Sequence, residues 1–365
     1  MQECILAGCD LHDKTMLVKV AEGREEPEKY SWTNTPGGRG AMVKKLQQLS
    51  LRGKKRVIFA YEASGQGFGL HDELSEAGIE CHVLAPTKMA KSAKSRRSKT
   101  DEKDAEMILE VLRGHVLAGN KLPSVWVPDK ETRDDREVVR ARLDVSEKIT
   151  SVKVQVRTLL KRNGVEQPAR MKKGWAVDYR RWLRGLTESG GELGAGAKVA
   201  LRSLLRQMDA LEEEMGKLDD AVGDLSEKKR YAGPVRALTG QKGVGIVIAM
   251  VYLTEMGDLS RFGNRKAVGS YLGLTPSSDE TGQQGEKKGH ITHQGPYRVR
   301  RVLCQGVWSR VRTDEETTAA YGRIVAKNPK HKKIAVVAMM RRLAVTLWRV
   351  GREAQAKSGS FAKAA

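Results

Sequence analysis

Apolar residues change their spacing along the chain, from short runs near the N-terminus to helical periodicity further on. Three short runs have the β-branched and aromatic content of strands: residues 4–20, 56–62 and 79–86. A turn at His12–Lys14 divides the first run, and residues 70–77 have helical character. Strands that alternate with helices predict an α/β layered fold for this part.

A further helix is expected to begin near Thr100, whose hydroxyl can cap it ahead of an acidic first turn. Four apolar residues then follow at helical spacing: Ala105, Ile108, Leu109 and Leu112. Just before it, residues 88–103 form a basic stretch.

Two long charged segments, 130–163 and 197–230, carry apolar residues at helical periodicity. In the second segment these residues form a nearly heptad stripe from Leu201 to Leu225. The pattern predicts a helical hairpin or a coiled coil, and it makes self-association into a homodimer or tetramer plausible. The glycine-rich piece at 184–197 is expected to be a loop.

The last third begins with Gly243 and Gly245 before an apolar helix that Gly257 ends. A short helix follows, then a polar, glycine-studded stretch expected to be a loop, and then basic helices. We therefore expect four segments: an α/β domain at 1–125, a helical linker or coiled coil at 126–232, a mainly α domain at 233–350 and a disordered tail at 351–365.

The charge balance points to a polyanionic partner. Lys and Arg number 66 against 45 Asp and Glu, which gives a formal net charge of +21. Nucleic acid fits this surplus, because each neutralised phosphate releases counterions; a merely basic soluble protein is the alternative. The cysteines show no zinc spacing, and no apolar run or leader suggests a membrane or secretion. We expect a reduced, cytoplasmic protein that does not enter a membrane.

Acidic residues follow the predicted elements in a pattern that suggests a metal site. Asp10 and Glu62 end two strands, while Asp101 and Asp104 lie three apart on a helix and so share a face. Parallel strands would bring the first two to one sheet edge. Crowded carboxylates repel one another, and Mg²⁺ or Mn²⁺ bound between them relieves the repulsion and can assist phosphoryl displacement. The alternative is that each is an ordinary strand-end or helix-start charge.

The segments AGCDLHDK, FAYEASG and KTDEKDAE resemble the three signature blocks of DEDD-type insertion-sequence transposases, now described as bridge-RNA-guided recombinases. GVGIVIAMVYLTEMGD, RFGNRKAVGSYLGLTP and KKGHITHQGPYRVRRVL are similar to that family's C-terminal domain. The resemblance covers both ends of the chain in order, and the middle helices carry little motif.

The resemblance implies a ribonuclease-H-like (RuvC-like) N-terminal domain, and a C-terminal transposase domain of serine-recombinase type. It places metal ligands at four residues: Asp10, Glu62, Asp101 and Asp104. It also implies a covalent protein–DNA intermediate on a serine, target and donor DNA as substrates, a non-coding guide RNA and a multimeric complex in a bacterial cytoplasm.

The family's serine stands just before a glycine, and here Thr281 precedes Gly282 at that place. Three interpretations stay open: Thr281 is the nucleophile, Ser277 or Ser278 replaces it, or the chain is impaired in cleavage. The extra methyl group of threonine restricts its side chain and crowds its approach to phosphorus.

Two groups of cations, one just before Asp101 in the sequence and one after Thr281, are candidates for binding the nucleic-acid backbone. The first group lies in the basic stretch: Lys94, Arg96, Arg97 and Lys99. The second follows Thr281: Lys287, Lys288, His290, Arg298, Arg300 and Arg301. A solvated basic face is the alternative for any one of them.

The sequence thus predicts an RNA-guided DNA recombinase with a four-carboxylate Mg²⁺ site. Two rivals remain: a metal-dependent nuclease without a covalent intermediate, and a non-catalytic nucleic-acid-binding protein derived from a transposase.

Overall fold

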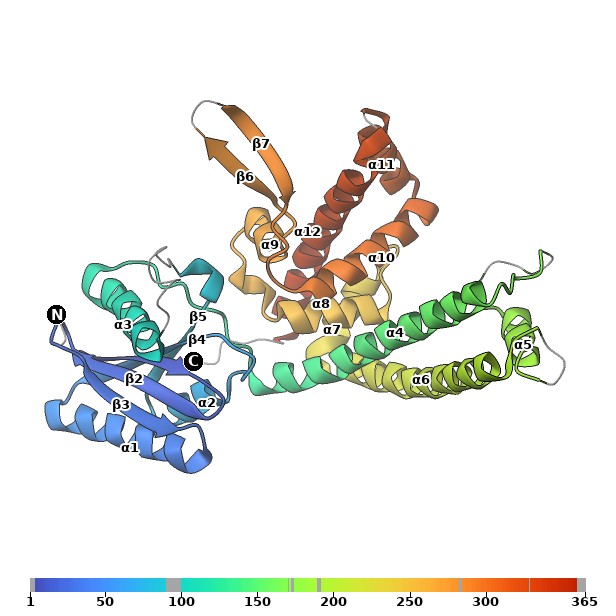
Figure 1. Cartoon of the computed structure of the whole chain (residues 1–365). Coiled ribbons are helices and arrows are strands. Elements are labelled where there is room, and N and C mark those ends of the chain that lie inside the picture. Colours follow the sequence, from blue (N-terminus) through green and yellow to red (C-terminus); the bar gives the residue numbers. More distant parts are fainter. Residues whose placement is uncertain are drawn as a thin grey trace. The chain divides into compact units, whose positions relative to one another are not determined.

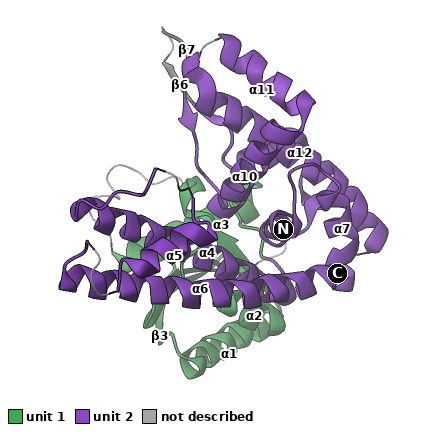
Figure 2. Cartoon of the chain, turned by 90° about the vertical axis from the view of Figure 1, so that its right-hand side faces the viewer, with its two compact units in different colours: residues 1–127 green, residues 128–365 purple. Residues whose placement is uncertain are grey.

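The computed structural model describes residues 4–89, 100–169, 171, 174–188, 192–281, 284–327 and 329–359. Within residues 278–288 it describes the backbone of the strands but not the side chains. The chain divides into two compact units, Met1–Val127 and Pro128–Ala365, which Figure 2 distinguishes by colour.

The first unit contains a five-stranded sheet of order β3-β2-β1-β4-β5. Its strands are β1 (Cys4–Leu11), β2 (Thr15–Glu22), β3 (Glu28–Thr33), β4 (Arg56–Glu62) and β5 (Glu80–Leu84). β1, β2 and β3 form an antiparallel meander, whereas β4 pairs parallel to β1, and β5 pairs parallel to β4. The α/β architecture and the division of the first run into two strands are confirmed.

Helices cover both faces of this sheet, as Figure 1 shows: α1 (Pro36–Gly53) on one side and α3 (Asp101–Ala118) on the other. Odd-numbered β1 residues such as Ala7 and Cys9 join the core beneath α1, together with Leu74 of α2 (Gly69–Glu76). The alternate residue Leu6 packs with Ile108 of α3 on the opposite face. The sequence patterns did not reveal β3 or α1.

Gly8 allows α3 to lie against β1. A Cβ added there would be 2.5 Å from the backbone oxygen of Ala105 and 2.5 Å from the backbone nitrogen of Leu109. Because both atoms belong to helix backbone, a side chain at this position would have to displace α3 itself. The N-terminal turn of the helix is thereby held close to the end of β1.

The second unit begins with a helical hairpin formed by α4 (Lys130–Arg162) and α6 (Ala195–Glu227), with α5 (Val177–Gly185) near its tip (Figure 1). Leu201, Leu205 and Met208 of the predicted stripe pack with Val152 and Val156 of α4 and close a small core there. The hairpin alternative is therefore confirmed. The expected loop at 184–197 is shorter than predicted, because α5 ends at Gly185 and α6 begins at Ala195.

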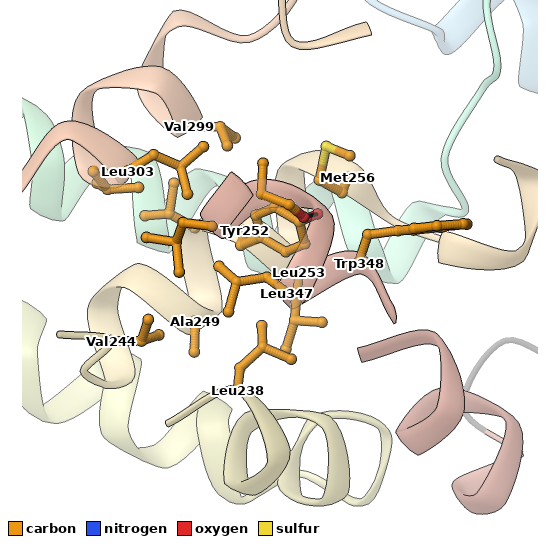
Figure 3. Close-up of a cluster of buried hydrophobic side chains, with 14 of the residues drawn as sticks. Leu238, Val244, Ala249, Tyr252, Leu253, Met256, Val299, Leu303, Leu347 and Trp348 are labelled. Atoms are coloured by element: carbon orange, nitrogen blue, oxygen red, sulfur yellow. Dashed lines mark hydrogen bonds between the residues drawn. The ribbon is translucent and has the colours of Figure 1, made fainter. Parts of the chain in front are cut away.

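The remaining helices surround a larger core, part of which Figure 3 shows. They are α7 (Lys229–Thr239), α8 (Ile246–Met256), α9 (Arg265–Tyr271), α10 (Tyr297–Thr313), α11 (Glu315–Lys327) and α12 (Lys332–Ser358). α8 lies at the centre: the hydroxyl of its fully buried Tyr252 donates to the carbonyl of Ala344 at 2.7 Å. The indole of Trp348 donates to the carbonyl of Leu259 at 3.0 Å.

Two predictions for this unit were wrong. The polar stretch after Leu274 forms a β-hairpin, β6 (Pro276–Thr281) and β7 (Gln284–Ile291), rather than a loop. The two strands were not recognised, because this segment consists mainly of glycine and polar residues. An exposed two-stranded ribbon lacks the apolar alternation that identifies a half-buried strand. The tail expected to be disordered from residue 351 is also partly wrong, since α12 continues to Ser358 and buries Gly351 and Gln355.

All four cysteines are free, as expected from their spacing. Among the described residues, no helix is long and apolar enough to cross a membrane.

Candidate functional site

Asp10 and Glu62 lie on neighbouring parallel strands. Cys9 pairs with Tyr61 in the register of β1 and β4, so the next residue of each strand, Asp10 and Glu62, lie side by side at the carboxyl edge. Strand alternation directs both toward the face that α3 covers, as it does Leu6 and Ile58. The two strand ends therefore lie at the same edge of the sheet, as the parallel pairing predicts.

Asp101 and Asp104 lie in the first turn of α3. Thr100 caps this helix as predicted, since its hydroxyl accepts a hydrogen bond from the backbone N–H of Lys103 at 3.4 Å. The helix N-terminus favours carboxylates at these positions, because unpaired N–H groups give it a partial positive charge. Close packing over Gly8 brings this turn to Asp10.

The imidazole of His12 connects the two elements. Its Nε2 lies 3.0 Å from Oδ2 of Asp10 and 3.4 Å from Oδ1 of Asp101. Among the described residues, the three side chains form a group whose ligand atoms all lie within 4.8 Å of one another. Glu62 lies beside Asp10 on the neighbouring strand, and Asp104 lies in the same helical turn as Asp101, but neither belongs to this group. A donor set of two carboxylates and one imidazole fits a divalent cation.

The electrostatics of Asp10 reflect this crowding. Burial, the largest cause, raises the pKa of Asp10 above its ordinary value, and the negative charges of Asp104 and Asp101 raise it further. The charge and hydrogen bond of His12 lower it. All three neighbours thus act electrostatically on one carboxylate, because their charges lie close to it.

Glu102 lies between Asp101 and Asp104 in the sequence, but two lysines balance its charge. Lys19 Nζ lies 2.5 Å from its Oε1, and Lys29 Nζ lies 3.0 Å from its Oε2. The hydrogen bond from Lys19, then that from Lys29, and then their charges lower the pKa of Glu102 to about 2. The lysines of β2 and β3 thus hold Glu102 and anchor the start of α3 to the sheet.

An open pocket of about 910 Å³ adjoins the carboxylates, lined by Leu11, His12, Asp13, Lys14, Thr15, Ser64, Gly65 and Gln66. Asn34 holds its walls together: its Nδ2 donates to the carbonyl of His12 at 2.8 Å and to Oε1 of Gln66 at 2.7 Å. Gln66 in turn donates to Oδ1 of Asp13 at 3.1 Å. The β1–β2 turn and the loop after β4 therefore form one polar rim.

Sequence reasoning did not identify His12 as a site residue, because it interpreted residues 12–14 only as a turn. The available signal was the spacing Asp-x-His at a strand end, since residues two apart in extended backbone share a side. His290 and His293 also lie close together in sequence, but neither joins a metal-binding group among the described side chains.

Thr281, the candidate nucleophile, is the last residue of β6 and pairs with Gln284 of β7. The side chains of Thr281, Ser278, Lys287 and Lys288 lie outside the described part of the structure. Ser277 donates a hydrogen bond from its hydroxyl to the carbonyl of His290 at 3.0 Å, across the hairpin. The side chain of His290 is exposed.

The three predicted arginines of α10 have partners within their own unit. Arg298 Nη2 lies 2.9 Å from Oδ1 of Asp144, and Arg301 forms an ion pair with Glu147. Arg300 donates from Nη1 to the carbonyls of Leu272, Gln294 and Gly295 at 2.7–3.2 Å. These contacts give the arginines a structural role. The other predicted cations, Lys94, Arg96, Arg97 and Lys99, lie outside the described residues.

Comparison with known families decides the identity of the chain. Residues 7–163 match the DEDD-type transposase family of IS110, and residues 235–322 match the transposase IS116/IS110/IS902 family. Together the two domains occur in the order that the signature blocks suggested. The chain is a transposase of the IS110/IS116 family. The enzyme class, a DNA recombinase or transposase, is confirmed.

Curated relatives agree along nearly the whole length of this transposase. A putative transposase, y4qE, of Sinorhizobium fredii is 27% identical over 95% of the chain and 88% of the relative. A second putative transposase of that organism, y4rJ, is 28% identical over 80% of the chain and 76% of the relative. The transposase for insertion sequence element IS1533 of Leptospira borgpetersenii is 22% identical over 84% of the chain and 86% of the relative.

Proposed function

We propose that this transposase cuts and rejoins DNA at a divalent-metal centre in its first unit, with Asp10, Glu62, Asp101 and Asp104 as carboxylate ligands. The observation that carries the proposal is the convergence of Asp10 and Asp101 on one point from separate elements. The strand order of the sheet and the helix against β1 support a ribonuclease-H-like fold.

A divalent cation held at this centre, Mg²⁺ or Mn²⁺, would supply polarisation of the scissile phosphate and stabilisation of the charge that develops on it. Asp10 and Glu62 would hold it from the sheet, and Asp101 and Asp104 from α3. The polar rim around Asn34 and Gln66 would admit the sugar–phosphate backbone beside this centre, because its pocket is open and lined by hydrogen-bonding groups.

The test is a cleavage and strand-transfer assay with DNA from the ends of the element. Asp104→Asn removes one charge and keeps the shape of the side chain, so we expect recombination to be lost while the thermal unfolding curve stays unchanged. Glu106→Gln, on the next turn of α3, is the matched control and should keep activity. Full activity of Asp104→Asn would remove that residue from the site.

We further propose that a hydroxyl on β6, that of Thr281, attacks the phosphorus of a DNA phosphodiester and displaces a deoxyribose hydroxyl, which leaves the DNA joined to the protein through a phosphodiester. We also propose that a guide RNA selects the target. An element-end DNA mixed with co-transcribed RNA should then give a shifted band on a denaturing gel. Thr281→Ala should lose this band and Thr281→Ser should keep or increase it, because serine lacks the crowding methyl group. A band that persists in Thr281→Ala but disappears in Ser277→Ala or Ser278→Ala would move the nucleophile upstream.

A metal-dependent nuclease is the second candidate, and it is favoured by the group of Asp10, His12 and Asp101, which lies wholly within the first unit. It predicts cleaved DNA with free 5′-phosphates and no covalent band in any variant. We also propose that the active species is a homodimer or tetramer, which light scattering of the complex with nucleic acid tests. A strictly monomeric active complex would contradict that assembly.

A further inference from the structure

We propose that His12 is a direct ligand of the cation and raises the affinity of the centre for first-row transition metals, such as Mn²⁺ and Co²⁺, relative to Mg²⁺. The inference rests on the metal-dependent function proposed above. It adds a nitrogen donor to a site that the sequence describes as carboxylate alone.

The distances around the imidazole suit coordination. Ligand atoms at adjacent octahedral positions, each about 2.1 Å from an ion, lie about 3 Å apart. His12 Nε2 lies 3.0 Å from one oxygen of Asp10 and 3.4 Å from one oxygen of Asp101. The three atoms therefore need to move little to surround a common centre.

The backbone holds His12 in place independently of its ring. Its N–H donates to the carbonyl of Thr15 at 2.9 Å, which closes the β1–β2 turn. Its carbonyl accepts from Nδ2 of Asn34 at 2.8 Å, and Arg39 Nη1 donates to Oδ1 of Asn34 at 3.0 Å. A residue whose main chain is already fixed beside two carboxylates loses little backbone entropy when its ring binds a cation.

A nitrogen ligand changes which cation binds best. Mg²⁺ prefers oxygen ligands and gains little from imidazole, whereas affinity for nitrogen rises from Mn²⁺ to Co²⁺ and Ni²⁺. A centre of carboxylates alone would distinguish these cations less strongly, because all its donor atoms are oxygen. With His12 included, the ratio of Co²⁺ to Mg²⁺ affinity should depend on this one side chain.

The chain offers a matched control in His82. Its Nε2 lies 2.9 Å from Oε1 of Glu80, two residues before it on β5. The spacing and distance repeat those of His12 and Asp10, but among the described residues no second carboxylate joins His82 in a metal-binding group. His82→Gln therefore removes a comparable histidine–carboxylate contact from the same sheet.

The experiment uses the full-length protein stripped of metal and then loaded with Mn²⁺. Pulsed electron paramagnetic resonance should detect coupling of Mn²⁺ to a directly bound imidazole nitrogen in wild type and in His82→Gln, and should lose it in His12→Gln. Loss of an outer-shell partner already costs about 10- to 100-fold in metal affinity. His12→Gln should therefore lose at least about tenfold in Co²⁺ affinity, while its Mg²⁺ affinity stays near wild type. Circular dichroism checks that each variant is folded.

Nitrogen coupling that survives in His12→Gln would overturn the inference, as would an equal loss of Mg²⁺ and Co²⁺ affinity, which indicates that His12 only positions the carboxylates. Asp10→Asn separates this result from failure of the proposed function. If Asp10→Asn binds cations as wild type does, the carboxylate centre itself is wrong. If Asp10→Asn loses cation binding while His12→Gln keeps the wild-type ratio of Co²⁺ to Mg²⁺ affinity and the nitrogen coupling, the carboxylate centre stands and His12 is not a ligand.

Discussion

Gly8 determines the candidate centre, although it carries no functional group. Its missing side chain lets the backbone of α3 lie against β1, so the distance between Asp10 and Asp101 depends on it. A close approach of this kind leaves only a lone glycine in a strand as its sequence signal, and a glycine inside a strand can equally mark a bulge or a tight bend.

Gly8→Ala should therefore destabilise the first unit and weaken its metal binding together. A Cβ 2.5 Å from two backbone atoms of α3 cannot be relieved by side-chain rotation. We expect a loss of about 1–3 kcal/mol in the free energy of unfolding, as for other overpacked sites. Denaturant unfolding and calorimetric metal titration measure the two effects.

Gly40→Ala in α1 is the matched control, since nothing lies within 4 Å of its added Cβ. It should stabilise the fold by about 0.4–1 kcal/mol through the unfolded state. Equal stability of Gly8→Ala and wild type would show that α3 is free to shift and does not set the geometry of the centre.

At the scale of residues, the sequence predicted the carboxylates but not His12. Strand ends and a capped helix can be inferred from local patterns, and with them the positions of Asp10, Glu62 and Asp101. The position of His12 depends on the conformation of the turn after β1, and Asn34 of the β3–α1 connection holds that turn by a long-range hydrogen bond. No local pattern contains that contact.

Among the elements, the long periodic segments were predicted, whereas α1 and the β6–β7 hairpin, whose apolar patterns are weak, were missed. β4 runs from Arg56 to Glu62 as expected, and α4 and α6 lie where the apolar stripes placed them. α1 contains three glycines near its start and buries only Met42 and Leu46, so its pattern is weak. The β6–β7 hairpin is polar except near its base, where Ile291 packs against the core, and its two strands form a sheet of their own.

The attachment of α4 to α8 depends on a buried ion pair that provides an element-scale prediction. Arg140 donates to both oxygens of Glu255, at 2.8 and 3.1 Å, and Arg136 donates to the carbonyl of Thr254 beside it. The side chain of Glu255 is only 7% exposed. Glu255→Ala leaves Arg140 and Arg136 partly buried without that charge, so we expect a loss of about 3–5 kcal/mol in unfolding free energy.

An exposed pair serves as the control for this measurement. Lys217 and Glu213 on α6 lie 2.9 Å apart with side chains 63% and 72% exposed. Lys217→Ala should cost less than about 1 kcal/mol, because water and salt screen surface charges. Similar losses in both variants, measured by denaturant unfolding, would mean that the contact with α8 does not hold the hairpin.

For the whole molecule, the excess of 66 basic over 45 acidic residues predicts salt-dependent binding of nucleic acid. The structure indicates which basic side chains should contribute to DNA binding and which should not. Arg298 and Arg301 form ion pairs with Asp144 and Glu147 of α4, so much of their charge is already compensated. The basic stretch before α3 includes the four cations predicted to bind the nucleic-acid backbone, which lie close to the capped helix in sequence: Lys94, Arg96, Arg97 and Lys99.

Replacing these four cations with glutamine should flatten the salt dependence of DNA binding. On duplex DNA each phosphate contact contributes about 0.9 to the slope of log affinity against log salt, so loss of all four contacts would lower the slope by about 3 to 4. Fluorescence anisotropy at several salt concentrations measures it. The double variant Arg298→Gln, Arg301→Gln removes two charges from α10; it should lower the unfolding temperature and leave the slope nearly unchanged. If the double variant flattens the slope more than the fourfold variant does, the arginines of α10 contact phosphate and their ion pairs with α4 give way when DNA binds.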